Sequence, residues 1–173
     1  MTARGPFLRA GLVAAAVIVV DQLSKSVASS GIERGSRVEL LGPLKLTLSH
    51  NDGVAFGLAG GGGVLVIGLS MIALIALGAF VASTPHRKGI WLAAGLIFGG
   101  AVGNLVDRVR LGHVVDFILL PGWPAFNFAD CAITVGVVLL TWSLVRDDRG
   151  NRNRDRGTEG PAPEKRDSTE VAA

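Results

Sequence analysis

Two aspartates in the second half of the chain stand where a carboxylate is costly. Asp116 lies inside the apolar run at 114–118, and Asp130 lies at the start of a long apolar segment. An unpaired acid among Val, Phe and Ile carries a large desolvation penalty, so its presence suggests a functional role. Two carboxylates that come together can share one proton, one acting as a base toward water and the other as an acid toward a substrate. The pair therefore predicts acid–base hydrolysis.

Asp130 also has a purely structural interpretation. Asn127, Asp130 and Thr134 fall on one face of a predicted helix, which we expect to point into a helical bundle. Asn127 followed three residues later by an acid also resembles a capping box, in which both side chains satisfy free N–H groups at the helix start. The capping box makes Asp130 structural, but it leaves Asp116 unexplained.

A third aspartate, Asp107, continues a row of small residues. Glycines recur every four residues on one helix face, which lets a neighbouring helix approach closely: Gly95, Gly99 and Gly103. Asp107 follows one turn later on that face, and Asn104 and Arg108 occupy the adjacent row. Two interpretations stay open for Asp107: a packing role capped by a network with Arg108, and a role in catalysis.

The sequence offers little for a metal site. No His-Glu-x-x-His pattern occurs, and His113 with Asp116 supplies too few ligands for a catalytic zinc. Cys131 is the single cysteine, which excludes an intramolecular disulfide and a cysteine-based zinc cluster. We expect neither a metal nor a cofactor.

Nucleophilic serine chemistry is also disfavoured. Ser70 falls within one predicted spanning segment, whereas His86 falls at the end of that segment and His113 beyond the next one. Ser24 and Lys25 are neighbours on a predicted helix and point in different directions, which is wrong for a Ser/Lys dyad. The paired aspartates remain the best candidates for chemistry.

The composition is that of a membrane protein. Of the 173 residues, 49% are hydrophobic and 18% are charged, and the mean hydropathy is +0.47. Seven of the 17 Lys and Arg and seven of the 14 Asp and Glu lie from Arg146 onward, so the rest of the chain has little charge for a solvated surface. The basic residues are scattered, which argues against nucleic-acid binding.

Four segments are long and apolar enough to cross a bilayer, where a helix must satisfy its own backbone hydrogen bonds. They are predicted at 7–28, 63–82, 89–106 and 129–145. A signal peptide is an alternative for the first segment, with a weak cleavage site near Ala28, but Asp21 and Lys25 interrupt the region that should stay apolar. We therefore predict an all-α membrane fold, a bundle of four transmembrane helices.

Lys and Arg residues near the helix ends predict the orientation. One side of the predicted bundle carries most of them: Arg4, Arg9, Arg87, Lys88 and the cluster from Arg146 to Arg156. Both termini are therefore expected in the cytoplasm. The acidic residues outside the tail are then expected at or toward the outer face.

The segment between the first two spans is predicted to form strands. Residues 44–49 alternate strictly between apolar and polar, which is typical of a half-buried strand. A Gly-Pro turn at 42–43 separates them from a second strand at 37–41, so we expect a small extracytoplasmic β-sheet between the first two helices. From Arg146 onward the chain is charged and poor in large apolar residues. We predict a membrane domain over 1–145 and a disordered cytoplasmic tail over 146–173.

Five sequence blocks, in this order, resemble the bacterial lipoprotein signal peptidase family, also called signal peptidase II. The blocks are DQLSK at 21–25, NDGVAFG at 51–57, GGAVGNLVDR at 99–108, VVDF at 114–117 and FNFAD at 126–130. The resemblance covers residues 7 to 145. It implies an aspartyl endopeptidase of the bacterial cytoplasmic membrane that removes signal peptides from prolipoproteins, cutting on the N-terminal side of a diacylglyceryl-modified cysteine.

The same resemblance assigns roles to individual residues. It implies that Asp116 and Asp130 are catalytic and that Asp107 supports them. It also implies polar and glycine positions that line the site, bind substrate or form the polar end of the first helix: Asp21, Lys25, Asn51, Gly53, Asn104, Arg108 and Asn127.

Two other functional classes stay open from the residues alone. A small transporter or proton-conducting protein is expected to place acidic groups near the bilayer centre, whereas here they cluster toward one face. A structural protein that packs in a helical assembly is expected to contact its partner through the row from Gly95 to Gly103. Neither class explains the five blocks. Cys131 lacks the apolar and small residues that precede a lipoprotein cysteine, so we expect the chain to act on prolipoproteins in membrane lipid and not to be one.

Overall fold

The computed structural model describes residues 4–53, 62–83 and 89–158. Its helices are α1 (Arg4–Gly31), α2 (Gly62–Ser83), α3 (Ile90–Leu111) and α4 (Phe128–Thr158). All four are long and apolar enough to cross a membrane. The predicted four-helix membrane bundle is thereby confirmed, and the first three helices start and end close to the predicted bounds.

Helix α3 contacts each of the other three helices, and glycines make its contacts with α1 close. A Cβ added at Gly99 would lie 2.7 Å from Cβ of Val17 and 2.8 Å from the backbone O of Ala14. Gly95 faces the backbone of Ala10 in the same way. Hydrophobic burial gives lipid-embedded helices little drive to associate, so such close backbone packing holds them together. The predicted packing role of the glycine row is therefore confirmed against α1.

Replacing Gly99 by Ala should destabilise the bundle. The added methyl group collides with backbone and Cβ atoms of α1, and overpacking of this kind typically costs about 1–3 kcal/mol. Gly68→Ala in α2 is the matched control, because a Cβ there meets nothing within 4 Å. Thermal unfolding of detergent-purified protein should show a lower Tm for Gly99→Ala only. Equal Tm values for the two variants would mean that α1 and α3 do not pack this closely.

The sheet has three antiparallel strands in the order β1 (Arg37–Leu41), β2 (Leu44–Asn51) and β3 (Val114–Leu119). The predicted hairpin of the first two strands is confirmed, with Gly42 at its turn in the left-handed region. The prediction missed β3, which joins the sheet from between α3 and α4. A short continuous apolar run fits a buried strand or a helix equally well, so periodicity alone could not identify it.

Local turns place β3 and bring the chain back beside it. Helix α3 ends at Leu111 and is capped by Gly112 in the left-handed conformation, and the N–H of Gly112 donates to the backbone O of Arg108 (3.1 Å). Asp116 lies opposite Ser49 of β2. After β3, Phe126 pairs with Ile118 through two backbone hydrogen bonds of 2.8 and 2.9 Å. The residues after Phe126 therefore return to the strand that carries Asp116.

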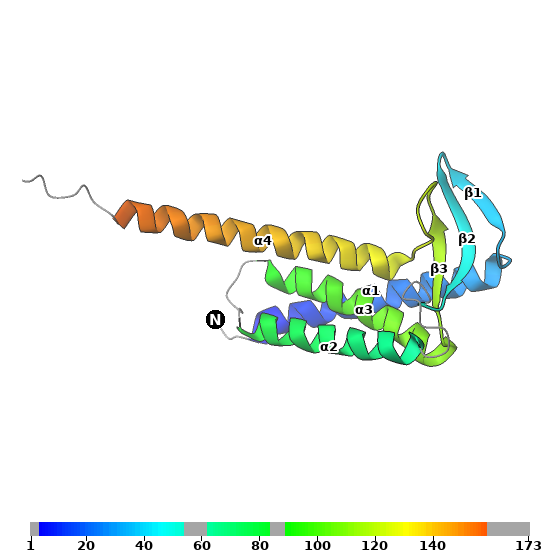
Figure 1. Cartoon of the computed structure of the whole chain (residues 1–173), viewed down its shortest axis with the longest axis horizontal. Coiled ribbons are helices and arrows are strands. Elements are labelled where there is room, and N and C mark those ends of the chain that lie inside the picture. The colour runs from blue at the N-terminus through cyan, green and yellow to red at the C-terminus, as the bar shows by residue number, and fades with distance from the viewer. Residues whose placement is uncertain (1–3, 54–61, 84–88, 159–173) are drawn as a thin grey trace, which may run out of the picture.

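The sheet stands across the end of the bundle at which α1 and α3 end and α4 begins (Figure 1). At the opposite end, α4 extends well beyond the other helices (Figure 1). The expectation of disorder directly after Arg146 differs from the structure, because α4 continues to Thr158. Adding residues to an existing helix is far easier than starting one, which favours this extension. Residues 159–173 of the predicted tail lie outside the described residues.

Candidate active site

Asp116 lies on β3 with its carboxylate buried and held by two side-chain amides. Nδ2 of Asn51 donates to its Oδ2 (3.0 Å), and Nδ2 of Asn127 donates to its Oδ1 (2.7 Å). Only 2% of the residue is exposed. Burial raises the pKa of Asp116 to about 6; the two amide hydrogen bonds oppose the rise and the charge of Asp130 adds to it. Asp116 is thus a carboxyl group that can hold a proton near neutral pH.

The capping box at the start of α4 is present. The backbone N–H of Asp130 donates to Oδ1 of Asn127 (3.0 Å), and the backbone N–H of Asn127 donates to Oδ2 of Asp130 (3.2 Å). The cap engages one carboxylate oxygen, whereas Oδ1 of Asp130 accepts a hydrogen bond from Nδ2 of Asn104 (2.8 Å). The capping box therefore explains where Asp130 points, and it is compatible with a chemical role.

Asn127 is the residue that joins the two aspartates. Its Nδ2 donates to Asp116, and it also lies 3.1 Å from Oδ1 of Asn104 and 3.3 Å from the backbone O of Val115. Its backbone N–H reaches Asp130, and the residue is fully buried. A single rigid residue thus fixes both carboxylates.

A buried ion cluster lies behind these amides. Nζ of Lys25 is 2.8 Å from Oδ2 of Asp21, 2.8 Å from Oδ2 of Asp107 and 2.8 Å from Oδ1 of Asn104. Three acceptors match the three protons of an ammonium group. Because Oδ1 of Asn104 accepts from Lys25, its Nδ2 is directed toward Asp130. The cluster therefore sets the orientation of an amide that holds the candidate pair.

The cluster ties the elements of the site together. Asp21 and Lys25 lie one turn apart on α1, where side chains meet. A Cβ at Gly103 would lie 2.6 Å from Oδ2 of Asp21, so only glycine lets α3 approach this pair. Oδ1 of Asp21 accepts the backbone N–H of Ala129 at the start of α4 (2.9 Å). Helices α1, α3 and α4 thus meet at one polar centre.

The position of Asp107 in the sequence allowed a network with Arg108, but the ion pair of Asp107 is formed with another residue. Among the described residues its ion partner is Lys25, and its carboxylate also accepts the backbone N–H of Val115 (3.2 Å). Nε2 of Gln22 donates to Oδ1 of Asp107 (2.9 Å). Sequence reasoning did not single out Gln22, although it stands between Asp21 and Lys25 in the first block.

Asn51 and Gly53 form a turn at the end of β2. The backbone N–H of Gly53 donates to Oδ1 of Asn51 (3.0 Å), which leaves Nδ2 of Asn51 directed toward Asp116. Gly53 has a φ of 72°, a conformation that favours glycine. Arg108 is half-buried and interacts electrostatically with Asp130, Asp116 and Asp107. The predicted site residues thus gather in one polar group beside the sheet.

Other residues that the sequence brought into consideration lie elsewhere. Thr134 was expected to point into the bundle, but it is exposed, and its hydroxyl donates to the backbone O of Asp130 (2.8 Å). The rings of His50 and His113 stack with centroids 3.9 Å apart. His86 and residues 54–57 of the second block lie outside the described residues. Within the described part of the chain, no three His, Cys, Asp or Glu side chains are grouped to hold a metal ion.

Comparisons with known proteins show which family this chain is similar to. A sequence model of the family described as "Signal peptidase (SPase) II" matches residues 13–146. The lipoprotein signal peptidase of Moorella thermoacetica is 41% identical over 142 residues, which cover 81% of this chain and 93% of the relative. That of Caulobacter vibrioides is 44% identical and covers 74% of this chain and 81% of the relative.

A solved structure described as a bacterial membrane enzyme is similar in fold and in sequence. It superposes with a TM-score of 0.75 at 33% identity, over 80% of this chain and 93% of the other. The family resemblance of the five sequence blocks is thereby confirmed. The chain belongs to the signal peptidase II family of aspartic-type peptidases.

Proposed function

We propose that this chain removes signal peptides from prolipoproteins with Asp116 and Asp130 as its catalytic pair. One observation carries the proposal: Asn127 holds Asp116 through its side chain and Asp130 through its backbone N–H. Two carboxylates fixed by one residue are suited to act as a unit. The names of the relatives, lipoprotein signal peptidases, support the class of substrate.

The raised pKa of Asp116 supports a division of roles within the pair. Asp116 holds the shared proton, and the ionised Asp130 takes a proton from water as the water oxygen attacks the scissile carbonyl carbon. Asp116 gives its proton to the carbonyl oxygen in the same step. When the tetrahedral intermediate collapses, the C–N bond breaks, Asp130 protonates the leaving nitrogen, and the proton on the oxygen returns to Asp116.

The neighbouring residues position this pair and receive the substrate. Asn51 and Asn104 hold the two carboxylates, and Lys25 orients Asn104. Asp21 and Asp107 neutralise Lys25 and hold the helix ends in place. Arg108 is half-buried beside the pair, where its guanidinium can donate to carbonyl groups of the substrate backbone.

The scissile bond is proposed to lie on the N-terminal side of a diacylglyceryl-modified cysteine. The test is incubation of purified protein in detergent with two precursors that differ only in the diacylglyceryl group, followed by measurement of signal-peptide release. The lipidated form should be cut at least about tenfold faster, because the lipid anchors the cleavage site at the membrane surface. Protein carrying Asp116→Asn, purified in parallel, controls for contaminating proteases. Absence of cleavage contradicts the function, and equal rates contradict the lipid requirement.

The enzyme is proposed to lie in the bacterial cytoplasmic membrane with both termini in the cytoplasm and the catalytic pair toward the outer face. The distribution of Lys and Arg supports this orientation. A reporter that is active only outside the cytoplasm should be silent when fused after His86 or Arg146 and active when fused after Arg37. Activity of the His86 fusion would reverse the placement of the site.

A further inference from the structure

A glutamine on α1 reaches across to α3 beside the buried ion cluster. Nε2 of Gln22 lies 2.9 Å from Oδ1 of Asp107, 3.2 Å from the backbone O of Gly103 and 3.3 Å from Oδ2 of Asp21. A side-chain amide has two protons to donate, and the two shorter contacts both go to α3. Gln22 therefore joins α1 to α3 through one amide group, at the level of the ion cluster.

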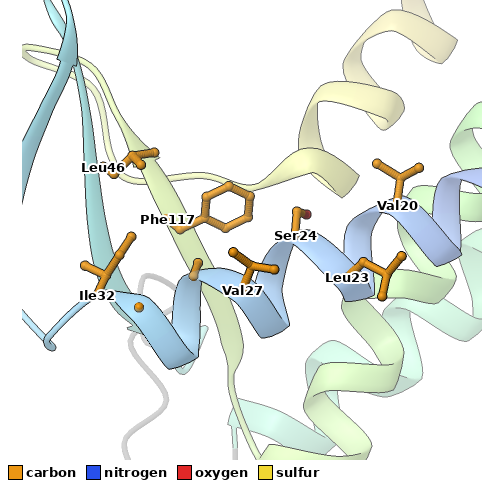
Figure 2. Close-up of a pocket in the computed structure, with 9 residues that line it drawn as sticks. Val20, Leu23, Ser24, Val27, Ile32, Leu46 and Phe117 are labelled. Carbon is orange, nitrogen blue, oxygen red and sulfur yellow. The ribbon is translucent and has the colours of Figure 1, made fainter.

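The stretch of α1 that carries Gln22 is otherwise largely apolar on its surface. Val20, Leu23 and Val27 are exposed there, inside the spanning segment Gly5–Gly31 (Figure 2). A polar side chain at such a depth is costly unless a neighbouring helix supplies its hydrogen-bond partners. Helix α3 supplies these partners to the amide of Gln22.

Gln22 completes the hydrogen bonding of the Asp107 carboxylate. Oδ2 of Asp107 accepts from Nζ of Lys25 (2.8 Å) and from the backbone N–H of Val115 (3.2 Å). Oδ1 accepts from Gln22, and among the described residues it has no second donor. Asp107 is 3% exposed, so water is a poor substitute for the missing partner. Without Gln22, one buried oxygen is unsatisfied and the carboxylate is free to rotate.

The carboxylate of Asp107 serves both members of the catalytic pair. It holds the backbone N–H of Val115, the residue that precedes Asp116 on β3. It also binds Lys25, which orients the amide that donates to Asp130. The direction of this one carboxylate therefore bears on the position of Asp116 and on the position of Asp130.

We propose that Gln22 is a positioning residue for cleavage, which fixes the carboxylate of Asp107 and thereby the catalytic pair. The assignment rests on the proposed function. Gln22 has no hydrogen bond to either catalytic aspartate within the described part of the chain, so it acts through Asp107. Displacing a catalytic group by about 1 Å can lower the rate roughly 100-fold. The loss should fall on kcat, because the amide of Gln22 is directed at α3 and not at a substrate.

The first test removes the amide and keeps the length of the side chain. Gln22→Met should lower kcat for a lipidated precursor by about 10-fold to 100-fold and leave KM unchanged. Ser24→Ala is the matched control on the same helix, because it also loses a hydrogen bond, but that bond goes to the backbone O of Asp21 within α1. It should match the wild type. All rates are measured below the Tm of every variant, so that loss of folded protein does not lower kcat.

The second test uses Gln22→Glu to separate positioning from packing. Asp21 and Lys25 of α1 and Asp107 of α3 are the titratable groups in contact with this position. A protonated glutamic acid can donate its O–H to Asp107, whereas an ionised one cannot. At about pH 8 the kcat of Gln22→Glu should be as low as that of Gln22→Met. At about pH 5 it should exceed the kcat of Gln22→Met by at least about fivefold.

Three results would overturn the assignment. These are a kcat of Gln22→Met equal to that of the wild type, a loss that appears in KM alone, and equal kcat values for Gln22→Met and Gln22→Glu at both pH values. If Gln22→Met does not fold, Gln22→Asn takes its place, because its amide is one methylene group shorter and no longer reaches Asp107. Failure of wild-type protein to cut the precursor contradicts the proposed function itself.

Discussion

Asp116→Asn and Asp130→Asn should each abolish measurable cleavage. Asparagine keeps the shape of the side chain but cannot exchange a proton, and proton transfer by a placed group typically contributes about 100-fold to 10,000-fold in rate. Because Asn127 fixes both carboxylates, the pair should act as one unit, and the double variant should be no worse than either single one. Release of signal peptide from a lipidated precursor, measured as kcat/KM, gives the comparison.

The control for these variants is Asp52→Asn. Asp52 is an exposed carboxylate next to Asn51, so its loss changes the charge near the site without touching the pair. It should retain near-normal cleavage. Near-normal cleavage by Asp130→Asn would instead mean that the capping box is the whole role of Asp130.

The thermal stability of the same Asp116→Asn variant, measured at several pH values, tests whether the carboxyl group of Asp116 is buried. Burial raises the pKa of Asp116 to about 6, above the ordinary 3.8, so the folded protein holds this proton more tightly than the unfolded chain does. That stabilising contribution is complete below pH 3.8 and is lost as the pH rises through 6. Asparagine does not titrate. The Tm of the variant minus that of wild type should therefore increase between about pH 4 and pH 8. The corresponding change in the difference between their free energies of unfolding is about 3 kcal/mol.

The pH dependence separates ionisation from hydrogen bonding. The carboxylate of Asp116 accepts from two amides, and an Asn side chain has only one acceptor oxygen, so the variant loses one hydrogen bond at every pH. That loss shifts the Tm difference by a constant amount. A difference that stays flat with pH would show that Asp116 titrates like an exposed carboxyl.

Lys25→Met should be among the most destabilising single changes in the chain. Lys25 is 3% exposed and pairs with Asp21 and Asp107 at 2.8 Å each, so its removal leaves two buried carboxylates without their cation. Breaking a buried pair in this way typically costs about 3–5 kcal/mol. Detergent-purified protein should show a much lower Tm, together with a loss of cleavage because Asn104 is no longer oriented.

Two further variants give this prediction its controls. Lys45→Met removes an ion pair with Glu39 of similar length (3.0 Å) at the surface, and such pairs contribute about 0–1 kcal/mol, so its Tm should hardly change. Lys25→Met combined with Asp21→Asn and Asp107→Asn makes the cluster neutral. It should recover part of the lost Tm. Equal Tm values for the Lys25→Met and Lys45→Met variants would show that the cluster is hydrated and not buried.

The family resemblance implied the residues around the candidate pair, whereas the sequence by itself determined the helices of the bundle, the first two strands and the pair Asp116 and Asp130. The reason is that these features are local. A span requires a continuous apolar run, a half-buried strand requires alternation, and a carboxylate such as Asp116 is conspicuous because its immediate neighbours are apolar. The capping box at Asn127 and Asp130 is equally local, and it could be read from a spacing of three residues.

Only the tertiary structure decided how these residues are paired. The sequence offered Arg108 as the neighbour of Asp107, whereas the ion partner is Lys25 on another helix, which reaches it because the glycine row lets α1 and α3 approach. It also gave no sign that β3 pairs with β2, the register that places Asn51 against Asp116. Such contacts join segments far apart in the chain. They depend on helix packing distance and strand register, and no local pattern of residues encodes either.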